Sequence, residues 1–227
     1  EVIFTLIITL VLVFIVVYIF LQDFRSTLIP MIAVPVALIG TFLFLWIFGF
    51  SINLLTLSAL LLAIAIVVDD AIVVVEAVHA KLDQGYKSAL TASIDAMNEI
   101  SGAIISITLV MSAVFVPVSF IGGTSGYFYR EFGVTMAVSI VISAINALTL
   151  SPALCAVLLK PHEEGHEKKM SFVDRFHAGF NYQFDKITNK YKGGVKWVIN
   201  HGVIAGSLVA VSIVGLVALM GTTKTGL

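Results

Sequence analysis

The stretch AIAIVVDDAIVVVE, residues 63–76, places two adjacent carboxylates, Asp69 and Asp70, inside a run of Ala, Ile and Val. The surrounding apolar segment, residues 54–78, is long enough to cross a bilayer core about 30 Å thick at a helical rise of about 1.5 Å per residue. A helix is the expected conformation, because each unpaired backbone group in lipid costs several kcal/mol. The stretch therefore predicts a transmembrane helix that carries two acidic groups within its apolar run.

The composition of the whole chain also indicates a membrane protein. Its 227 residues are 59% hydrophobic and 12% charged, with a mean hydropathy of +1.06, whereas soluble domains are typically about 45–50% apolar and about 25% charged. The net charge of −1 gives no sign of a nucleic-acid partner. The one cysteine, Cys155, can form no intrachain disulfide, so the fold does not depend on an oxidising compartment.

Six apolar stretches have the length of a transmembrane helix. They are residues 3–21, 28–48, 54–78, 100–121, 132–159 and 200–220. The predicted fold class is an all-α polytopic membrane helix bundle with six transmembrane helices. Pro30 and Pro35 open the second span, Pro117 ends the fourth and Pro152 falls late in the fifth, so we interpret these prolines as start signals or tolerated kinks.

The basic residues indicate how the helices are oriented. Three segments, 22–27, 79–99 and 160–199, carry most of them: Arg25, Lys81, Lys87, Lys160, Lys168, Lys169, Arg175, Lys186, Lys190, Lys192 and Lys196. The alternate connections and the C-terminal tail carry only Arg130 and Lys224. The positive-inside rule therefore places the three segments in the cytoplasm and both termini outside.

Residues 171–192 have a different pattern from the six spans. Aromatic and apolar residues recur there at every third or fourth position, and polar residues fill the other faces; the apolar set is Phe172, Phe176, Phe180, Phe184, Ile187 and Tyr191. Ser171 and Asp174 resemble an N-terminal capping arrangement. We predict an amphipathic helix that lies in the cytoplasmic interface of the bilayer.

The two aspartates need protein or water around them, because insertion scales assign about 2.5 to 3.5 kcal/mol to one central aspartate. Successive helical residues differ by about 100° in direction, so Asp69 and Asp70 can line one internal cavity at distinct positions. Desolvation disfavours the charged form of each carboxyl group, and the neighbouring like charge disfavours double ionisation. We therefore expect the coupled pair to bind protons near physiological pH.

A purely structural interpretation of the pair stays open at this point. The lipid span can end at Val68, with the aspartates capping a cytoplasmic helix. Residues 71–75 argue against this, since no polar residue follows the pair until Glu76. We interpret Glu76 as an interfacial carboxylate that faces water or Lys81.

A second motif, HEEGH at residues 162–166, fits the zinc-metalloprotease pattern in which His162 and His166 bind the metal and a glutamate acts as base. Here the motif follows Pro161, contains Gly165 and lies in a charged linker, and no third ligand is visible. We interpret it as solvated linker and predict no metal site. His79, His177 and His201 lie near interfaces, where an amphipathic ring is ordinary.

The third span and its neighbours resemble a known family. VVDDAIVVVEAV (residues 67–78), preceded by GFSINLLTLSALLLAIAI, is similar to the fourth transmembrane helix of the resistance-nodulation-division (RND) transporters, in their hydrophobe and amphiphile efflux branch. Three more segments resemble other helices of the family. YIFLQDFRSTLIPMIAVPVALIGTF (18–42) resembles its second to third helices, SAVFVPVSFIGGTSGYFYREFGVTMAVS (112–139) its fifth to sixth helices with their connecting turn, and LTLSPALCAVLLKP (148–161) the end of its sixth helix. One departure is Ala77, where many members have Asn.

The resemblance implies a role for the paired carboxylates and a division of the chain. Asp69 and Asp70 match the family's proton-relay residues, and neither a cofactor nor a metal is expected. Residues 1–160 would hold five helices of the N-terminal repeat, 161–199 a cytoplasmic linker with the interfacial helix, and 200–227 the first helix of the second repeat. The porter domains, the rest of the second repeat and its basic lysine lie outside this sequence, so the chain is expected to be part of a longer protein.

The expected function is the proton-translocating membrane part of a proton/drug antiporter driven by the proton motive force, and not an enzyme. The resemblance further implies the bacterial inner membrane and a homotrimer that exports amphiphilic or hydrophobic drugs through its porter domains. A periplasmic adaptor and an outer-membrane channel would be its partners. Two alternatives remain: a non-transporting membrane scaffold whose aspartates pair with a neighbouring helix, and, less favoured, an intramembrane aspartyl protease, which would need aspartates on separate spans.

Overall fold

The computed structural model describes residues 2–160 and 172–222 of the chain. These residues form eight helices and no strand: α1 (Val2–Leu21), α2 (Phe24–Ile47), α3 (Leu54–Asp83), α4 (Ala89–Val118), α5 (Thr124–Leu148), α6 (Leu150–Leu158), α7 (Phe172–Asn200) and α8 (Gly202–Thr222). Six helical segments are long and apolar enough to cross a membrane, and α5 and α6 together make one of them. The predicted all-α bundle with six transmembrane helices is confirmed.

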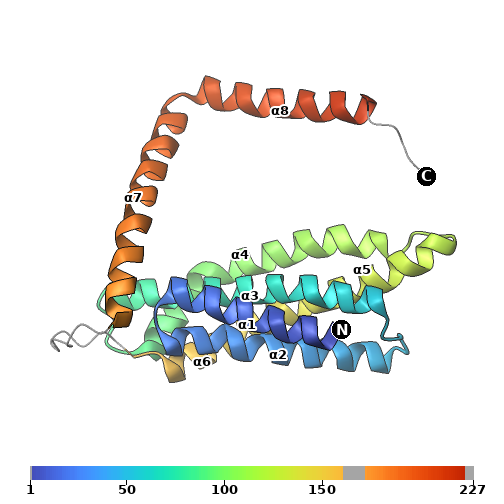
Figure 1. The fold of residues 1–227 in the computed structure, drawn as a ribbon, viewed down its shortest axis with the longest axis horizontal. Helices are drawn as coiled ribbons and strands as arrows, with labels where there is room; N and C mark the ends of the chain where they lie inside the picture. The colour runs from blue at the N-terminus through green and yellow to red at the C-terminus, as the bar shows by residue number, and fades with distance from the viewer. Residues whose placement is uncertain (1, 161–171, 223–227) are drawn as a thin grey trace. The chain divides into compact units, whose positions relative to one another are not determined.

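The chain divides into two compact units, residues 1–166 and 167–227. The first unit contains α1 to α6 and the second contains α7 and α8. Within the first unit the long helices lie side by side, and the α2–α3 and α4–α5 connections share one end (Figure 1). We call this the turn end, formed by residues 48–53 and 119–123, and we call the opposite end, with residues 22–23 and 84–88, the loop end.

Helix α3 is the centre of the first unit, where it packs against α2, α4 and α5. It contributes to all three buried apolar clusters. Ala63 shares one with Met136 of α5, and Val67 shares a second with Val34 of α2. Half of the residues in the most apolar membrane-length segment of α3 are buried, whereas 6% of the residues in the corresponding segment of α1 are buried. The helix with the acidic pair is therefore the best-packed helix of the bundle.

Side-chain caps set where α2 and α3 begin. Oδ2 of Asp23 accepts a hydrogen bond of 2.9 Å from the backbone N–H of Ser26, which starts α2 at Phe24, ahead of the predicted span 28–48. Pro30 and Pro35 consequently lie inside α2. The prediction that they open this helix is wrong. Asn53 caps α3 in a reciprocal arrangement with Thr56. An apolar run marks the lipid-embedded part of a helix, whereas the cap marks its actual start.

Helices α3 and α4 also extend past the predicted spans at the loop end. Helix α3 continues to Asp83 and α4 begins at Ala89, so their connection is residues 84–88 and not 79–99. An ion pair between Lys81 and Glu99 joins the two helices. The Tyr86 hydroxyl donates to Asp95 at 2.8 Å, and this bond raises the pKa of Tyr86. Polar contacts thus hold helical turns that a hydropathy pattern does not detect.

The fifth predicted span is broken near its end. Helix α5 stops at Leu148, Thr149 leaves helical geometry with φ −124° and ψ −63°, and α6 starts at Leu150. Pro152 lies in the first turn of α6, where its missing N–H leaves no helical bond unmade, while its ring would clash with the preceding turn of a continuous helix. Pro152 is therefore a helix start, one of the two interpretations that the sequence allowed.

Helices α4 and α5 approach each other closely at Gly133. A Cβ atom at this position would lie 2.8 Å from Oγ of Ser119 and 3.1 Å from the backbone oxygen of Phe115. We expect Gly133→Ala to destabilise the protein by about 1–3 kcal/mol, because overpacking forces the two backbones apart. Thermal unfolding in detergent measures this effect. Gly102→Ala on α4, where an added Cβ meets nothing within 4 Å, is the matched control; equal midpoints for the two variants would contradict the prediction.

The second unit contains the predicted amphipathic helix and the last predicted span. Helix α7 runs from Phe172 to Asn200 and passes through Gly193 and Gly194, so it is longer than the predicted 171–192. The aromatic pattern ends at Tyr191, but a glycine costs a helix only about 1 kcal/mol and does not have to stop it. The rings of Phe180 and Phe184 stack at 6.0 Å. Its place in the interface stays a prediction, and the HEEGH motif lies outside the described residues.

Candidate functional site

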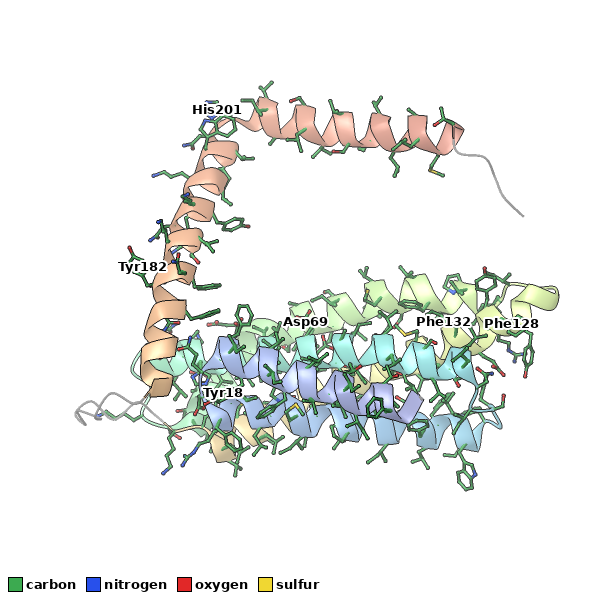
Figure 2. The ribbon with its side chains drawn as sticks, in the orientation of Figure 1. Tyr18, Asp69, Phe128, Phe132, Tyr182 and His201 are labelled. Atoms are coloured by element: carbon green, nitrogen blue, oxygen red, sulfur yellow. The ribbon has the colours of Figure 1, made fainter. Side chains whose placement is uncertain are left out.

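The predicted site residues lie midway along α3, as the labelled Asp69 shows in Figure 2. They differ in environment. Asp70 is partly buried against α5, whereas Asp69 is exposed on the surface of the first unit. The helix continues for several turns on both sides of the pair, with Val67, Val68 and Ala71 buried beside it. A cap at the start of a helix, the structural alternative raised above, is therefore excluded for this pair.

A serine from α5 holds Asp70. Oγ of Ser143 donates a hydrogen bond of 2.5 Å to Oδ2 of Asp70. Ser143 is itself 1% exposed, so the bond lies inside the contact between α3 and α5. Hydrogen bonds to charged groups typically contribute about 1.5–3 kcal/mol, more than neutral ones. The position of the Asp70 carboxyl group is thus coupled to the position of α5.

Asp69 belongs to an exposed stripe that runs the whole length of α3. Every exposed residue of this helix falls on it, at intervals of three or four: Leu54, Ser58, Leu62, Ala65, Asp69, Val73, Glu76, Ala80 and Asp83. That spacing is one face of a helix. The face combines apolar and small residues with three carboxylates, and it is the side of α3 that the first unit leaves uncovered.

No cation neutralises the acidic pair within the described part of the chain. The ion pair that the structure shows there is Lys81 with Glu99, and neither Asp69 nor Asp70 pairs with a lysine or arginine. Glu76 was expected to face water or Lys81. It is exposed, and Lys81 pairs with Glu99. The described residues also hold no cluster of three potential metal ligands. Ser143 is the one described side chain that binds Asp70.

Buried polar residues continue along α5 on both sides of Ser143. We call this set the polar seam: Glu131, Thr135, Ser139, Ser143 and Asn146. Their spacing of four, four, four and three places them on one face of α5. The seam contacts α2 as well as α3, because Thr41 meets Ser139 at 3.3 Å and the Asn146 amide donates to the carbonyl of Ala33 at 3.4 Å. A continuous polar strip therefore crosses the bundle beside Asp70.

A second polar network lies at the loop end. The Ser26 hydroxyl donates to Asp23 at 2.6 Å, and Nε2 of His79 lies 2.6 Å from the same hydroxyl oxygen. Since that hydroxyl proton already points at Asp23, the imidazole must be the donor to Ser26. Burial opposes ionisation of Asp23, but the bonds from Ser26 and the backbone outweigh it and lower the pKa of this carboxyl group. His79 therefore joins α3 to the start of α2, beyond the ordinary interfacial role expected for it.

The aspartates were predictable from the sequence, but the polar seam was not predicted. A pattern that indicates the seam is present in the sequence, since Thr135, Ser139 and Ser143 recur at every fourth residue within the span 132–159. Isolated hydroxyls in a membrane helix usually bond to their own backbone, as Thr135 and Ser139 also do. Only the packing of α5 against α2 and α3 reveals that all of them face inward.

The sequence is similar to one protein family and to several known efflux transporters. The model of the AcrB/AcrD/AcrF family matches residues 1–227. The multidrug export protein AcrF of Escherichia coli is 44% identical over 190 residues, which is 83% of this chain and 18% of that protein. The toluene efflux pump membrane transporter TtgB of Pseudomonas putida is 42% identical over 226 residues, 99% of this chain and 21% of that protein. The chain thus spans about a fifth of the length of these relatives.

Proposed function

The chain belongs to the AcrB/AcrD/AcrF family, and from this premise we propose that it forms the proton-binding part of the membrane domain of a drug efflux transporter. The observation that carries the proposal is the setting of Asp70. Its carboxyl group lies midway along a membrane-length helix, accepts a hydrogen bond from Ser143 and meets no cation in the described part of the chain. A carboxyl group in such a setting is suited to bind and release a proton.

Protonation changes the charge of the site and so its contacts. As a carboxylate, Asp70 accepts the hydrogen bond from the Ser143 hydroxyl and repels Asp69, and both carboxylates attract a cation. When the pair is protonated, the two side chains no longer repel each other and no longer attract a cation. Helix α3 is then free to shift against α5. One charge that crosses a membrane potential of 100 mV supplies about 2.3 kcal/mol, which is sufficient to bias two alternative packings. The protons would be taken up outside and released to the cytoplasm.

Further features of the transporter follow as parts of the same proposal. Residues 1–160 would supply five helices of the first repeat, 161–199 the linker and the interfacial helix, and 200–227 the first helix of the second repeat. A basic residue from the remainder of the protein would face Asp69. Drugs would be exported by porter domains outside the bilayer, in a homotrimer of the bacterial inner membrane that works with a periplasmic adaptor and an outer-membrane channel.

The alternative is a scaffold in which the aspartates are permanently paired with a basic residue of a neighbouring helix. The exposure of Asp69 on the α3 stripe favours a partner but does not distinguish a permanent pair from one that alternates. Protonation itself separates the two functions, because a permanent ion pair stays ionised across the physiological range.

Infrared spectroscopy of the full-length transporter tests the proposal directly. We expect pH titration near neutrality to show a protonated-carboxyl band that disappears in the Asp70→Asn variant, because asparagine has the same shape but binds no proton. Glu76→Gln serves as the control, since the exposed Glu76 is not part of the pair. A spectrum without any band that depends on Asp69 or Asp70 between pH 5 and 8 would support the scaffold and refute proton binding by the pair.

A further inference from the structure

We propose that Glu131 is a second proton-binding carboxyl group, through which protons reach Asp70 from the turn end of the bundle. This inference rests on the proposed function, because it gives the Asp69–Asp70 pair an access route. Glu131 has no role in the proposed function of Asp69 and Asp70 as stated above, and this inference gives it one.

Glu131 is an unusual residue for its position. It lies in the second turn of α5 and is 3% exposed. Oε1 of Glu131 accepts a hydrogen bond of 3.2 Å from the Ser51 hydroxyl, and Oε2 accepts one from the Asn53 amide. A buried ionised carboxylate is costly without a charged partner. Here the two neutral donors and the start of α3, which Asn53 caps, provide its stabilisation.

Glu131 is nevertheless accessible from one side. A pocket of about 260 Å³ opens at the turn end, and its lining includes Gly49, Ser51, Arg130 and Glu131. Phe128 and Phe132, the neighbours of Glu131 on α5, lie at this end of the bundle in Figure 2. The pocket therefore connects the surface to a carboxyl group that is otherwise enclosed, which is the geometry that proton uptake requires.

Few other titratable groups face this carboxyl group. The pocket lining adds Tyr127 and Arg130, both from α5. Nearby, residues 38–47 of α2, 54–68 of α3 and 109–118 of α4 contain no titratable side chain. Glu131 is therefore the one carboxylic acid among the lining of this pocket and these three segments.

The polar seam connects Glu131 to Asp70. From residue 131 to residue 143 the helix rises about 18 Å, with a hydroxyl at each turn between the two carboxyl groups. Thr135 and Ser139 lie in between, both buried, and Thr41 of α2 meets Ser139 at 3.3 Å. Successive hydroxyls on this face are about 6 Å apart, a separation that a single water molecule can bridge. Ser143 then contacts Asp70 at 2.5 Å.

The transfer balances without any other reactant. Glu131 gains a proton from water in the pocket and forms an O–H bond. When it releases that proton, each hydroxyl and bridging water in turn accepts one proton and donates another, and the last O–H bond forms on Asp70. Glu131 returns to the carboxylate and Asp70 becomes neutral. One proton has moved, and no electron has been transferred.

The test uses the full-length transporter in proteoliposomes, with drug transport measured while pH is varied on the side of the turn end. Glu131→Gln keeps an acceptor for Ser51 or Asn53 but binds no proton, whereas Glu131→Asp still binds one. We expect Glu131→Gln to lower the rate of drug transport at least about tenfold, which is less than a positioned proton-transfer group typically contributes. The transport rate of this variant should also no longer depend on the pH at the turn end. Glu131→Asp should retain that dependence.

Interruption of the seam gives an independent readout. Thr135→Val removes one buried hydroxyl, and Thr9→Val on α1 removes an exposed hydroxyl that also donates to a carbonyl four residues earlier. We expect slower transport for the first variant and an unchanged rate for the second. If Glu131→Gln shows the normal rate and pH profile, or if it and Glu131→Asp are equally slow with the normal profile, Glu131 is structural and the inference is wrong. Normal transport by Asp70→Asn would instead overturn the proposed function.

Discussion

Replacement of Asp70 by asparagine is expected to abolish proton-driven drug transport by the full-length transporter, with a loss of at least about a hundredfold, because a protonation step is removed and not merely weakened. The side chains are nearly isosteric, and the asparagine oxygen can still accept the Ser143 hydrogen bond. Packing around Val67 and Ala71 is therefore preserved, and the variant should be made at normal levels. Drug efflux from cells, normalised to the amount of protein in the membrane, measures the effect.

Two companion variants sharpen the interpretation. Asp69→Asn should also abolish transport, since Asp69 is the group that faces the uncovered side of α3. Ser143→Ala should only slow it, by about tenfold, because one hydrogen bond to a charged group is lost while both carboxyl groups remain. Proton-dependent efflux that persists in both Asp69→Asn and Asp70→Asn at normal expression would rule out the pair as a proton relay.

Much of the fold was predictable from the sequence, because lipid imposes a simple requirement. Six long apolar runs have to be helices when no water is present to satisfy the backbone, and the described residues contain six membrane-length helical segments. The ends of the helices were less predictable. Asp23 extends α2 and the Lys81–Glu99 pair helps extend α3 and α4, and these are polar interactions that follow from local geometry and not from hydropathy.

The candidate site was predictable in part for a related reason. Adjacent aspartates in an apolar helix are conspicuous, because each is costly when ionised in lipid. Ser143 and Glu131 are not conspicuous in the same way. A serine is common in membrane helices, and Glu131 follows Arg130 in the connection between the predicted spans 100–121 and 132–159, where a charged residue is ordinary. Their roles depend on which face of α5 is buried, and that face is set by contacts with helices far away in the sequence.

A tryptophan in place of Ala65 is expected to reduce transport at least about tenfold, a loss that corresponds to the 1–3 kcal/mol that overpacking commonly costs. Ala65 lies one turn before Asp69 on the exposed stripe of α3. The stripe contains three small residues, Ser58, Ala65 and Ala80, and small residues allow membrane helices to approach closely. If a helix from the remainder of the transporter covers this stripe, a bulky side chain separates it from Asp69. Efflux at matched expression measures the effect.

The control for this prediction is an equally large substitution on a different helix. Val11 of α1 is 52% exposed, and α1 packs mainly against α2. Val11→Trp should leave transport nearly unchanged, because an aromatic side chain among lipid tails displaces no protein. Equal transport by the two tryptophan variants would mean that the stripe faces lipid, and Asp69 would then have to be solvated by water or protonated. A loss confined to Ala65→Trp would place the partner of Asp69 on a neighbouring helix, which is where an alternating proton relay needs its counter-charge.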